Sequence, residues 1–309
     1  MEILVTGGYG YLGARIVRHL GDSMSVHAAS RQPRNTSQTV VDFSSPDSLQ
    51  KACHGKSVVI HTAGINASES AADPVAAYEV NAVATGRLIE AAIKENVRRF
   101  IYFSTAHVYR SPLQGVIDEN EPAVNLHPYA ASHRAGEEIL RYVTSLGKID
   151  GVVLRLSNAF GSPAIENSTC WHLLINDLCR QAVTSQELVL YSSGLQRRNF
   201  IPIETVCRAT AFFVNRSSSA PSDNVYNLGS SWNPTLREVA ELVQQRYLAR
   251  TGTKLPIRTA SARQGESSAD LDYSSRKLEL AGFQNDYDIH GELDSLFRYC
   301  ESHFMKNGN

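Results

Sequence analysis

The chain begins with a short apolar run that gives way to helical spacing. Residues 3–5 are consecutive aliphatic side chains, as in a buried strand, and residues 14–20 carry apolar side chains three and four positions apart, as on one face of a helix. Three glycines separate the two patterns, at Gly7, Gly10 and Gly13. We therefore expect a strand, a tight turn and a helix at the start of the chain.

The same alternation of strand and helix continues through the first half of the chain. Ser45, Pro46 and Asp47 mark a helix start, with a capping hydroxyl, a proline in the first turn and an acid against the helix dipole. The further predicted strands are residues 24–29, 40–43, 57–61 and 99–103, and the two long predicted helices are residues 73–96 and 128–146. Strands separated by helices pair in parallel with right-handed crossovers. The pattern predicts an α/β protein with a doubly wound parallel sheet.

The glycine spacing adds a chemical expectation to this fold. A turn without side chains between a strand and a helix lets a pyrophosphate approach the backbone amides and the partial positive charge of the helix N-terminus. Gly7 and Gly10 would form this cradle, and Gly13 lets the helix pack closely on the strand. We interpret the turn as a dinucleotide-binding site of the Rossmann type. A purely structural turn, for which glycine supplies positive φ, is the alternative.

The second half of the chain shows a looser alternation. Residues 171–183 are predicted to be helical, and a threonine caps a predicted helix over residues 235–248 that carries an apolar stripe. We expect a dinucleotide-binding domain over residues 1–160, to which residues 200–214 return, and a smaller α/β substrate-binding lobe over most of residues 161–309.

The end of the second predicted strand indicates which dinucleotide binds. NAD-binding folds usually carry an acid there for the ribose 2′-hydroxyl, whereas arginine accommodates the 2′-phosphate of NADP. Ser30 and Arg31 occupy this region, and no acid does. We therefore expect NADP as the cofactor. NAD is the alternative if Arg31 is only a solvated loop charge.

Composition excludes several other classes of protein. The 309 residues carry a formal net charge of −1 with scattered Lys and Arg, so no basic face argues for nucleic acid or an anionic membrane. The five cysteines are widely spaced without a CxxC pair, which fits reduced thiols in the cytoplasm and suggests no metal site. We expect neither a secretion signal nor a membrane span, because the first strand begins at residue 3 and no apolar run approaches ~18 residues.

Hydroxyl and ring side chains gather where an open α/β sheet positions its ligands. Thr105 follows the apolar strand over residues 99–103, and Tyr129 and His133 share one face of the helix that begins near residue 128. Open parallel sheets bind their ligands beyond the carboxyl ends of the strands. We therefore expect the chemistry of this protein in these two stretches.

These stretches resemble the extended short-chain dehydrogenase/reductases, especially the NAD-dependent epimerase/dehydratase group that acts on nucleotide sugars. The resemblance covers essentially the whole chain. Its motifs are the glycine turn at residues 6–13, residues 61–64, Asn81, residues 103–109, residues 127–138, residues 154–161, residues 194–201, residues 227–229 and residues 263–266. Several ordered motifs at family spacing are more specific than any one alone.

The resemblance implies hydride transfer at a sugar carbon. Thr105 would hydrogen-bond the substrate oxygen, and Tyr129 would exchange a proton with it. The implied cofactor-binding residues are Gly7, Gly10, Tyr11, Leu12, Gly13, Ser30, Arg31, Asp42, Phe43, Thr62, Ala63, Gly64, Asn81, Tyr129 and His133. The implied substrate-binding residues are Thr105, His107, Asn158, His172, Arg198 and Arg263, of which the two arginines would bind the phosphates of the sugar nucleotide.

One catalytic position departs from the family pattern. The family carries a lysine four residues after the tyrosine, where it favours the phenolate and holds the nicotinamide ribose, but this chain carries His133. A phenol with a pKa of ~10 needs nearby positive charge to act as a base at neutral pH, and imidazole with a pKa of ~6.5 is mostly neutral there. Three interpretations stay open: the site still works with His133, Arg134 or the oxidised nicotinamide supplying charge, Tyr129 acts chiefly as an acid in a carbonyl reductase, or redox activity is lost.

Two other histidines are candidate catalytic residues. His107 and His172 occupy positions that resemble the acid/base pair of the NADP-dependent epimerase-reductases that make GDP-fucose, and packing or loop histidines are the alternative. The dehydratases of the family carry an acidic pair just after the catalytic hydroxyl, where this chain has Ala106 and His107. Dehydration is therefore disfavoured.

The sequence leaves two classes of function open. The first is an NAD(P)-dependent epimerase or 4-keto-sugar reductase that acts on a nucleotide-activated sugar. The second is a catalytically silent NAD(P)-binding regulatory protein. Cofactor regenerated in each cycle would indicate an epimerase, and stoichiometric NADPH consumption a reductase. We also expect a cytoplasmic homodimer, paired through the helices over residues 73–96 and 128–146 as is common in the family.

Overall fold

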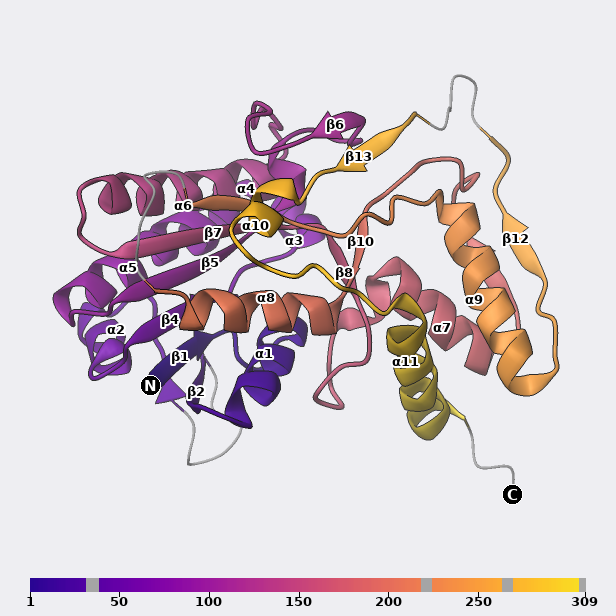
Figure 1. Cartoon of the computed structure of the whole chain (residues 1–309), viewed down its shortest axis with the longest axis horizontal. Helices are drawn as coiled ribbons and strands as arrows, with labels where there is room; N and C mark the ends of the chain where they lie inside the picture. Colours follow the sequence, from indigo (N-terminus) through magenta and orange to yellow (C-terminus); the bar gives the residue numbers. More distant parts are fainter. Residues whose placement is uncertain (32–38, 218–223, 263–268, 306–309) are drawn as a thin grey trace.

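A seven-stranded parallel sheet forms the centre of the larger part of the molecule (Figure 1). The computed structural model describes residues 1–31, 39–217, 224–262 and 269–305. In their order across the sheet, the strands are β11 (Val225–Leu228), β7 (Asp150–Leu156), β5 (Arg99–Thr105), β4 (Val58–His61), β1 (Glu2–Thr6), β2 (Ser25–Ser30) and β3 (Thr39–Val40). All neighbouring strands pair in parallel. The predicted α/β fold with a doubly wound parallel sheet is confirmed.

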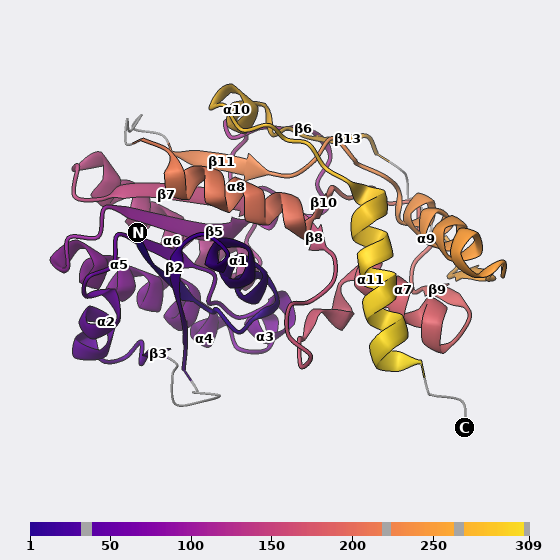
Figure 2. The same ribbon diagram turned by 60° about the horizontal axis from the view of Figure 1, so that its bottom comes forward.

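Helices cover both faces of this sheet. One face packs against α1 (Tyr11–Gly21), α8 (Ile203–Asn215) and α10 (Arg276–Leu280), and the other against α2 (Pro46–Cys53), α5 (Ala84–Lys94) and α6 (Pro128–Ser145). Side chains alternate along β1, so that Ile3 and Val5 join the first core whereas Leu4 joins the second. Figure 2 shows α1 and α8 side by side on their face of the sheet.

The helix expected over residues 73–96 is not one regular α-helix. It follows the short α3 (Ala67–Ala72) and comprises α4 (Pro74–Tyr78), the π-helical segment η1 (Glu79–Val83) and α5. Asp73 caps the start by accepting the Ala76 amide at 3.0 Å. A π-helical turn shifts the helical register and is frequent at functional sites. In this protein it carries Asn81, one of the predicted cofactor-binding residues.

Two other predicted elements have different bounds. The third strand was expected over residues 40–43, but β3 ends at Val40 because the chain turns where the Asp42 carboxylate accepts the Ser44 amide at 2.8 Å. The helix expected over residues 171–183 begins later. A 3₁₀ turn, η3 (Cys170–His172), comes first, and α7 (Leu174–Thr184) follows.

A second core lies beside the sheet, on the right of Figure 1. It is formed by α7, α9 (Leu236–Thr251) and α11 (Ile289–Phe304), and Thr235 caps α9 in a capping box with Glu238. Three parallel pairs of short strands complete the fold: β8 (Asn158–Phe160) with β10 (Phe200–Pro202), β9 (Leu188–Leu190) with β12 (Ile257–Thr259), and β6 (Gly115–Ile117) with β13 (Leu271–Tyr273).

The chain returns from the second core to the sheet after β10. It continues into α8, which packs against α1, and then into β11, which adds an edge strand that the sequence pattern had not assigned. Within the described ranges, no helix is both long and apolar enough to cross a membrane.

Candidate active site

The glycine turn joins β1 to α1 without placing a side chain at the helix start. Gly7 has a φ of 72°, in the left-handed region, and a Cβ on Gly13 would collide with the Gly7 carbonyl. Gly10 is the N-cap residue of α1 and supplies no side-chain acceptor, and the first turn contains no acid. The first amides of α1 therefore keep their donor capacity and partial positive charge for an anionic ligand.

A cavity of about 250 Å³ borders this turn. The predicted cofactor-binding residues that line it are Gly7, Gly10, Ser30, Arg31, Phe43, Thr62, Ala63 and Gly64. Asp42 is not among its lining residues, and the Asp42 carboxylate accepts the amide and the hydroxyl of Ser44 at 2.8 and 2.6 Å. Asp42 therefore shapes the turn after β3.

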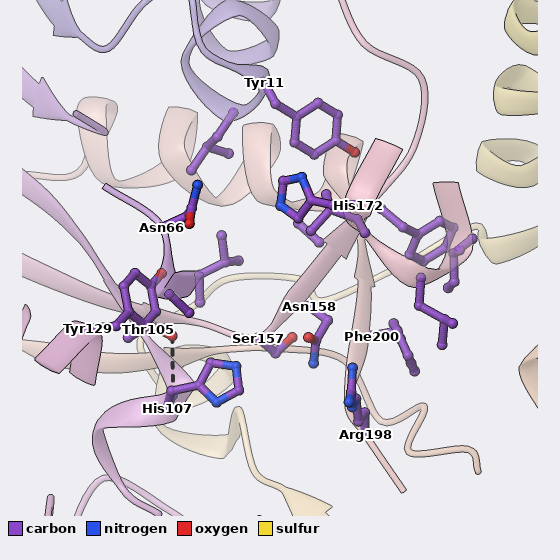
Figure 3. Close-up of a pocket in the computed structure, with 18 of the residues that line it drawn as sticks. Tyr11, Asn66, Thr105, His107, Tyr129, Ser157, Asn158, His172, Arg198 and Phe200 are labelled. Carbon is purple, nitrogen blue, oxygen red and sulfur yellow. Dashed lines mark hydrogen bonds between the residues drawn. The ribbon is translucent and has the colours of Figure 1, made fainter. Parts of the chain in front are cut away.

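A larger cavity, of about 690 Å³, borders the same turn through Tyr11 and Leu12 (Figure 3). The predicted catalytic and substrate-binding residues that line it are Thr105, His107, Tyr129, Asn158, His172 and Arg198. Arg263 lies outside the described residues. The fold thus brings side chains from distant parts of the sequence around one space.

Thr105 and Tyr129 form a hydroxyl pair in this cavity. Thr105 ends β5 and is only 5% exposed, and its Oγ1 accepts the amide of His107 at 3.2 Å. Tyr129 lies in the first turn of α6, where His127 Nδ1 accepts its amide at 3.2 Å. Burial raises the pKa of the Tyr129 phenol above its ordinary value, and the Thr105 hydroxyl opposes part of this shift. Tyr129 is therefore a phenol with a proton to donate at neutral pH.

His133 lies one helical turn beyond Tyr129 and behind it. The two rings make an edge-to-face contact with centroids 4.7 Å apart. His133 is buried, is not a lining residue of either cavity, and has Nδ1 2.9 Å from the Tyr102 hydroxyl. Burial lowers the pKa of His133 to about 4. The imidazole is therefore neutral at pH 7, unlike the lysine of the family pattern.

Asn81 connects the wall of the smaller cavity to α6. Its Oδ1 accepts the Ile65 amide at 3.0 Å, and its Nδ2 donates to Ser132 Oγ at 3.0 Å. Ile65 directly follows Gly64, which lines that cavity. Asn81 therefore holds the loop after β4 against the helix that carries Tyr129.

His107 and His172 face the larger cavity from different sides. Figure 3 shows His107 near Thr105 and Tyr129, and His172 near Tyr11. His107 lies in the 3₁₀ turn η2 (Ala106–Val108), with its ring centroid 6.4 Å from that of Tyr129. Removal from water lowers the pKa of His107, and the charges of Arg198 and His127 add to the shift. His107 is therefore the nearer of the two predicted histidines to the hydroxyl pair.

Arg198 and Asn158 provide polar groups toward the far end of the cavity. Arg198 Nη2 donates to Gln196 Oε1 at 3.1 Å, and no carboxylate in the described part of the chain forms an ion pair with it. Asn158 Nδ2 donates to the Asn199 carbonyl at 2.8 Å. The described residues contain no cluster of three or more His, Cys, Asp or Glu side chains that could hold a metal ion.

A family comparison identifies the class of this fold and site. The family described as "NAD dependent epimerase/dehydratase family" matches residues 3–229, a range that includes the residues lining both cavities. The protein belongs to this family. The resemblance that the sequence motifs indicated is therefore confirmed.

The family member is similar to enzymes of two activities. It is 24% identical over 309 residues to the UDP-glucose 4-epimerase of Halalkalibacterium halodurans, with 93% of this chain and 91% of that one covered. It is 26% identical over 266 residues to the dTDP-glucose 4,6-dehydratase of Streptomyces niveus, with 79% and 76% covered. Its fold matches the solved structure of MoeE5 in complex with UDP-glucose and NAD, with a TM-score of 0.80, 24% identity, and 97% and 98% of the two chains covered.

Tyr102 was missed by the sequence reasoning, and His61 was named only as part of the motif at residues 61–64, although it also lines the smaller cavity. Both are polar side chains within predicted strands, and both are 1% exposed. A hydroxyl or imidazole in an otherwise apolar strand was the available signal. The partners of these side chains depend on how β4 and β5 pack against α6, and the sequence pattern does not contain that information.

Proposed function

We propose that this family member transfers a hydride at a carbon of a nucleotide-activated sugar, either as an epimerase or as a 4-keto-sugar reductase. The observation that supports this most directly is the Thr105–Tyr129 pair in the larger cavity, beside the glycine turn. A buried phenol next to a second hydroxyl can exchange a proton with a sugar oxygen while both groups hydrogen-bond it. The known relatives named as UDP-glucose 4-epimerase and dTDP-glucose 4,6-dehydratase support the substrate class.

The proposed cofactor is a nicotinamide dinucleotide held along the glycine turn. The uncapped N-terminus of α1 and the side-chain-free approach at Gly7 and Gly10 fit its pyrophosphate. Ser30 and Arg31 line the smaller cavity at the end of β2, which supports NADP, and the NAD in the MoeE5 complex keeps NAD as the alternative. When bound, the nicotinamide supplies or takes up the hydride.

The chain's own residues handle the oxygen and its proton. Tyr129 gives a proton to the oxygen of a keto group, or takes one from a hydroxyl, and Thr105 orients the same oxygen by a hydrogen bond. His107 lies beside this pair and is a second candidate for proton exchange with the sugar, and His172 approaches from the opposite wall. Proton exchange with the sugar by His107 or His172 is part of this proposal.

The proposed substrate-binding part extends from the sheet to the second core. Arg198 carries a guanidinium without a carboxylate partner among the described residues, so it can bind a phosphate oxygen of the nucleotide. Asn158 lies between Arg198 and the hydroxyl pair in Figure 3 and is a candidate contact for the sugar. We keep the division into a dinucleotide-binding domain over residues 1–160 and a substrate lobe as part of this proposal.

Incubation with UDP-, GDP-, CDP- and dTDP-sugars and with their 4-keto forms tests the proposed function. NADPH absorbance and the stereochemistry of the products are followed together. Tyr129→Phe removes only the phenol oxygen and should lower kcat about 10² to 10⁴-fold. The matched control is Tyr226→Phe, which removes another buried phenol oxygen, hydrogen-bonded to Arg216 Nη1 at 3.0 Å on the edge strand β11.

Cofactor binding without turnover of any sugar in this panel would contradict the proposed function. It would support the alternative of a silent NAD(P)-binding protein. Equal loss of activity in Tyr129→Phe and in the control would contradict the role of Tyr129.

We also propose a homodimer in the cytoplasm. The outer surfaces of α4, η1 and α6 expose Val75, Tyr78, Val83 and Tyr142, which supports pairing through these helices. The five cysteines are all buried and free, which fits a reducing compartment. Sedimentation analysis of Tyr142→Glu tests the interface, because a charge there should shift a dimer toward the monomer while an unchanged dimer would contradict it.

A further inference from the structure

Tyr102 links the position that departs from the family pattern to the centre of the sheet. Its hydroxyl lies 2.9 Å from His133 Nδ1, and the two side chains are 1% and 7% exposed. The Tyr102 ring stacks between the rings of His61 and His133, with centroids 5.7 and 5.9 Å apart. The three rings form one buried stack from β4 through β5 to α6.

The hydrogen bonds of His61 fix its proton. Thr85 Oγ1 donates to the Asn81 carbonyl at 2.9 Å, so its oxygen can accept from His61 Nε2 at 3.0 Å. His61 Nδ1 then accepts the hydroxyl of Thr6 at 2.6 Å. Burial, with a smaller contribution from His133, lowers the pKa of His61 to about 3. His61 therefore brings no positive charge to the stack at neutral pH.

The other groups that face His133 do not supply a charge either. Tyr129 on its own helix and Tyr102 on β5 are both phenols whose pKa is raised by burial. Glu137, one turn further along α6, is fully buried and forms hydrogen bonds of 2.7 to 3.2 Å with the Arg155 guanidinium of β7. That carboxylate is neutralised by its partner, so it does not draw a proton onto the imidazole.

The single hydroxyl proton of Tyr102 decides the tautomer of His133. The hydroxyl lies 2.9 Å from His133 Nδ1 and 3.2 Å from the Asn81 carbonyl, which already receives the hydrogen of Thr85. The shorter contact and the more basic acceptor both favour donation to Nδ1. The proton of the neutral ring then lies on Nε2. No other described residue hydrogen-bonds Nε2, and a Cβ on Gly64, in the wall of the smaller cavity, would lie 3.8 Å from it.

We propose that Tyr102 is a positioning residue that holds His133 as a neutral imidazole with its proton on Nε2, and that this arrangement makes Tyr129 a proton donor in the reduction of a keto sugar. The directional part rests on the proposed function. His133 keeps one N–H directed toward the cofactor side of the site but lacks the charge that would convert Tyr129 into a base. An epimerase must also oxidise its substrate, so this arrangement favours the reductase.

The proton balance of this step is simple. The carbonyl carbon receives a hydride from NADPH, the electron pair of the C=O bond moves to the oxygen, and that oxygen takes the proton of the Tyr129 hydroxyl. The products are an alcohol, NADP⁺ and a phenolate. The phenolate regains a proton from the solvent through the larger cavity, which Tyr129 lines, so that one solvent proton is consumed in each turnover.

Imidazole ¹⁵N NMR tests the tautomer without turnover. Full-length protein with ¹⁵N-labelled histidine rings is compared as wild type, Tyr102→Phe and the matched control Tyr226→Phe, at about pH 6, 7 and 8, and His133→Met assigns the His133 signals. We expect the neutral Nε2–H form of His133 at each pH in wild type and control, and a mixture of tautomers in Tyr102→Phe. A charged ring at neutral pH, an Nδ1–H form, or an unchanged spectrum in Tyr102→Phe would overturn the proposal.

Kinetics test the consequence for the reaction. Tyr102→Phe should lower kcat for keto-sugar reduction about tenfold while KM for NADPH and for the sugar changes less than about twofold, and Tyr226→Phe should change neither. Equal melting temperatures of the two variants exclude a merely structural loss. Alcohol oxidation as fast as ketone reduction at neutral pH would overturn the directional part. If no sugar reacts although NADPH binds, the proposed function fails, and the NMR result still decides the role of Tyr102.

Discussion

Replacing His133 with lysine tests how the side chain at this position of α6 sets the acidity of Tyr129. The substitution restores the charge of the family pattern at a position whose ring lies 4.7 Å, centroid to centroid, from that of Tyr129. We expect the phenol to become easier to deprotonate, so that the site gains oxidation activity at neutral pH. The burial that lowers the His133 pKa will also oppose the lysine charge, and this sets the upper limit of the effect.

The magnitude follows from the distance between the two side chains. If the 4.7 Å between the two ring centroids is taken as the distance from the lysine charge to the phenolate, the attraction at an effective dielectric constant of ~20 is about 3.5 kcal/mol, or roughly 2.6 pKa units. A shift of this size would raise the phenolate fraction at neutral pH roughly 400-fold. Because a phenolate of lower pKa is a weaker base, the rate of alcohol oxidation should gain less, on the order of tenfold.

The assay is the pH profile of kcat for NADP⁺-dependent oxidation of the alcohol form of the sugar. His133→Met is the matched control, because methionine has nearly the length of lysine and no charge. We expect the rising limb of the Lys variant to lie about 2 to 3 pH units below that of the Met variant. Coincident limbs in the two variants, or a wild-type limb already near neutral pH, would refute the reasoning that charge at this position controls Tyr129.

Three other predictions concern binding and stability. Arg198→Ala should raise KM for the nucleotide sugar about 10 to 100-fold, because a charged hydrogen-bond donor to phosphate is lost, whereas the Kd of NADPH by fluorescence titration should stay within about twofold; equal losses would indicate misfolding. Arg31→Ala should weaken NADPH about tenfold and leave NADH unchanged, and parallel losses of both cofactors would argue against a 2′-phosphate contact. His61 and His133 have folded pKa values of about 3 and about 4, below their unfolded values, so their contribution to the free energy of unfolding is complete above pH ~6.5. Below that pH, stability falls by about 1.4 kcal/mol per pH unit for each histidine. Urea unfolding between about pH 7 and 5 measures this slope, which His133→Met should reduce by half, and a constant midpoint would contradict it.

Local sequence patterns were sufficient for the nucleotide end of the fold. The apolar run at residues 3–5 and the glycines that follow predicted β1, the turn and α1, because strand burial, positive φ and helix start are all properties of neighbouring residues. The same reasoning failed near residue 42, where a side-chain hydrogen bond to Ser44 ends the strand. It also missed the π-helical segment at Asn81, because a one-residue change of helical register leaves no mark on apolar spacing.

The candidate site was predicted in part. The motifs named Thr105 and Tyr129, and the structure places both at one cavity. The motifs also showed that this chain has His133 where the family has lysine, but three interpretations of that residue remained open. The burial of the ring and the 2.9 Å contact with Tyr102 depend on packing between β5 and α6, whose contacting residues lie 31 positions apart in the chain.

The sequence by itself determined the alternation of strand and helix, the glycine cradle and the family motifs, because each of these patterns is formed by residues within a few positions of one another. The tertiary structure decided which polar groups share a cavity, which are shut away from water, and which nitrogen of His133 meets a hydroxyl. The glycine turn establishes where an anionic ligand can approach. The environment of His133 sets the charge of the imidazole ring beside Tyr129. Desolvation and hydrogen bonding between distant segments create that environment.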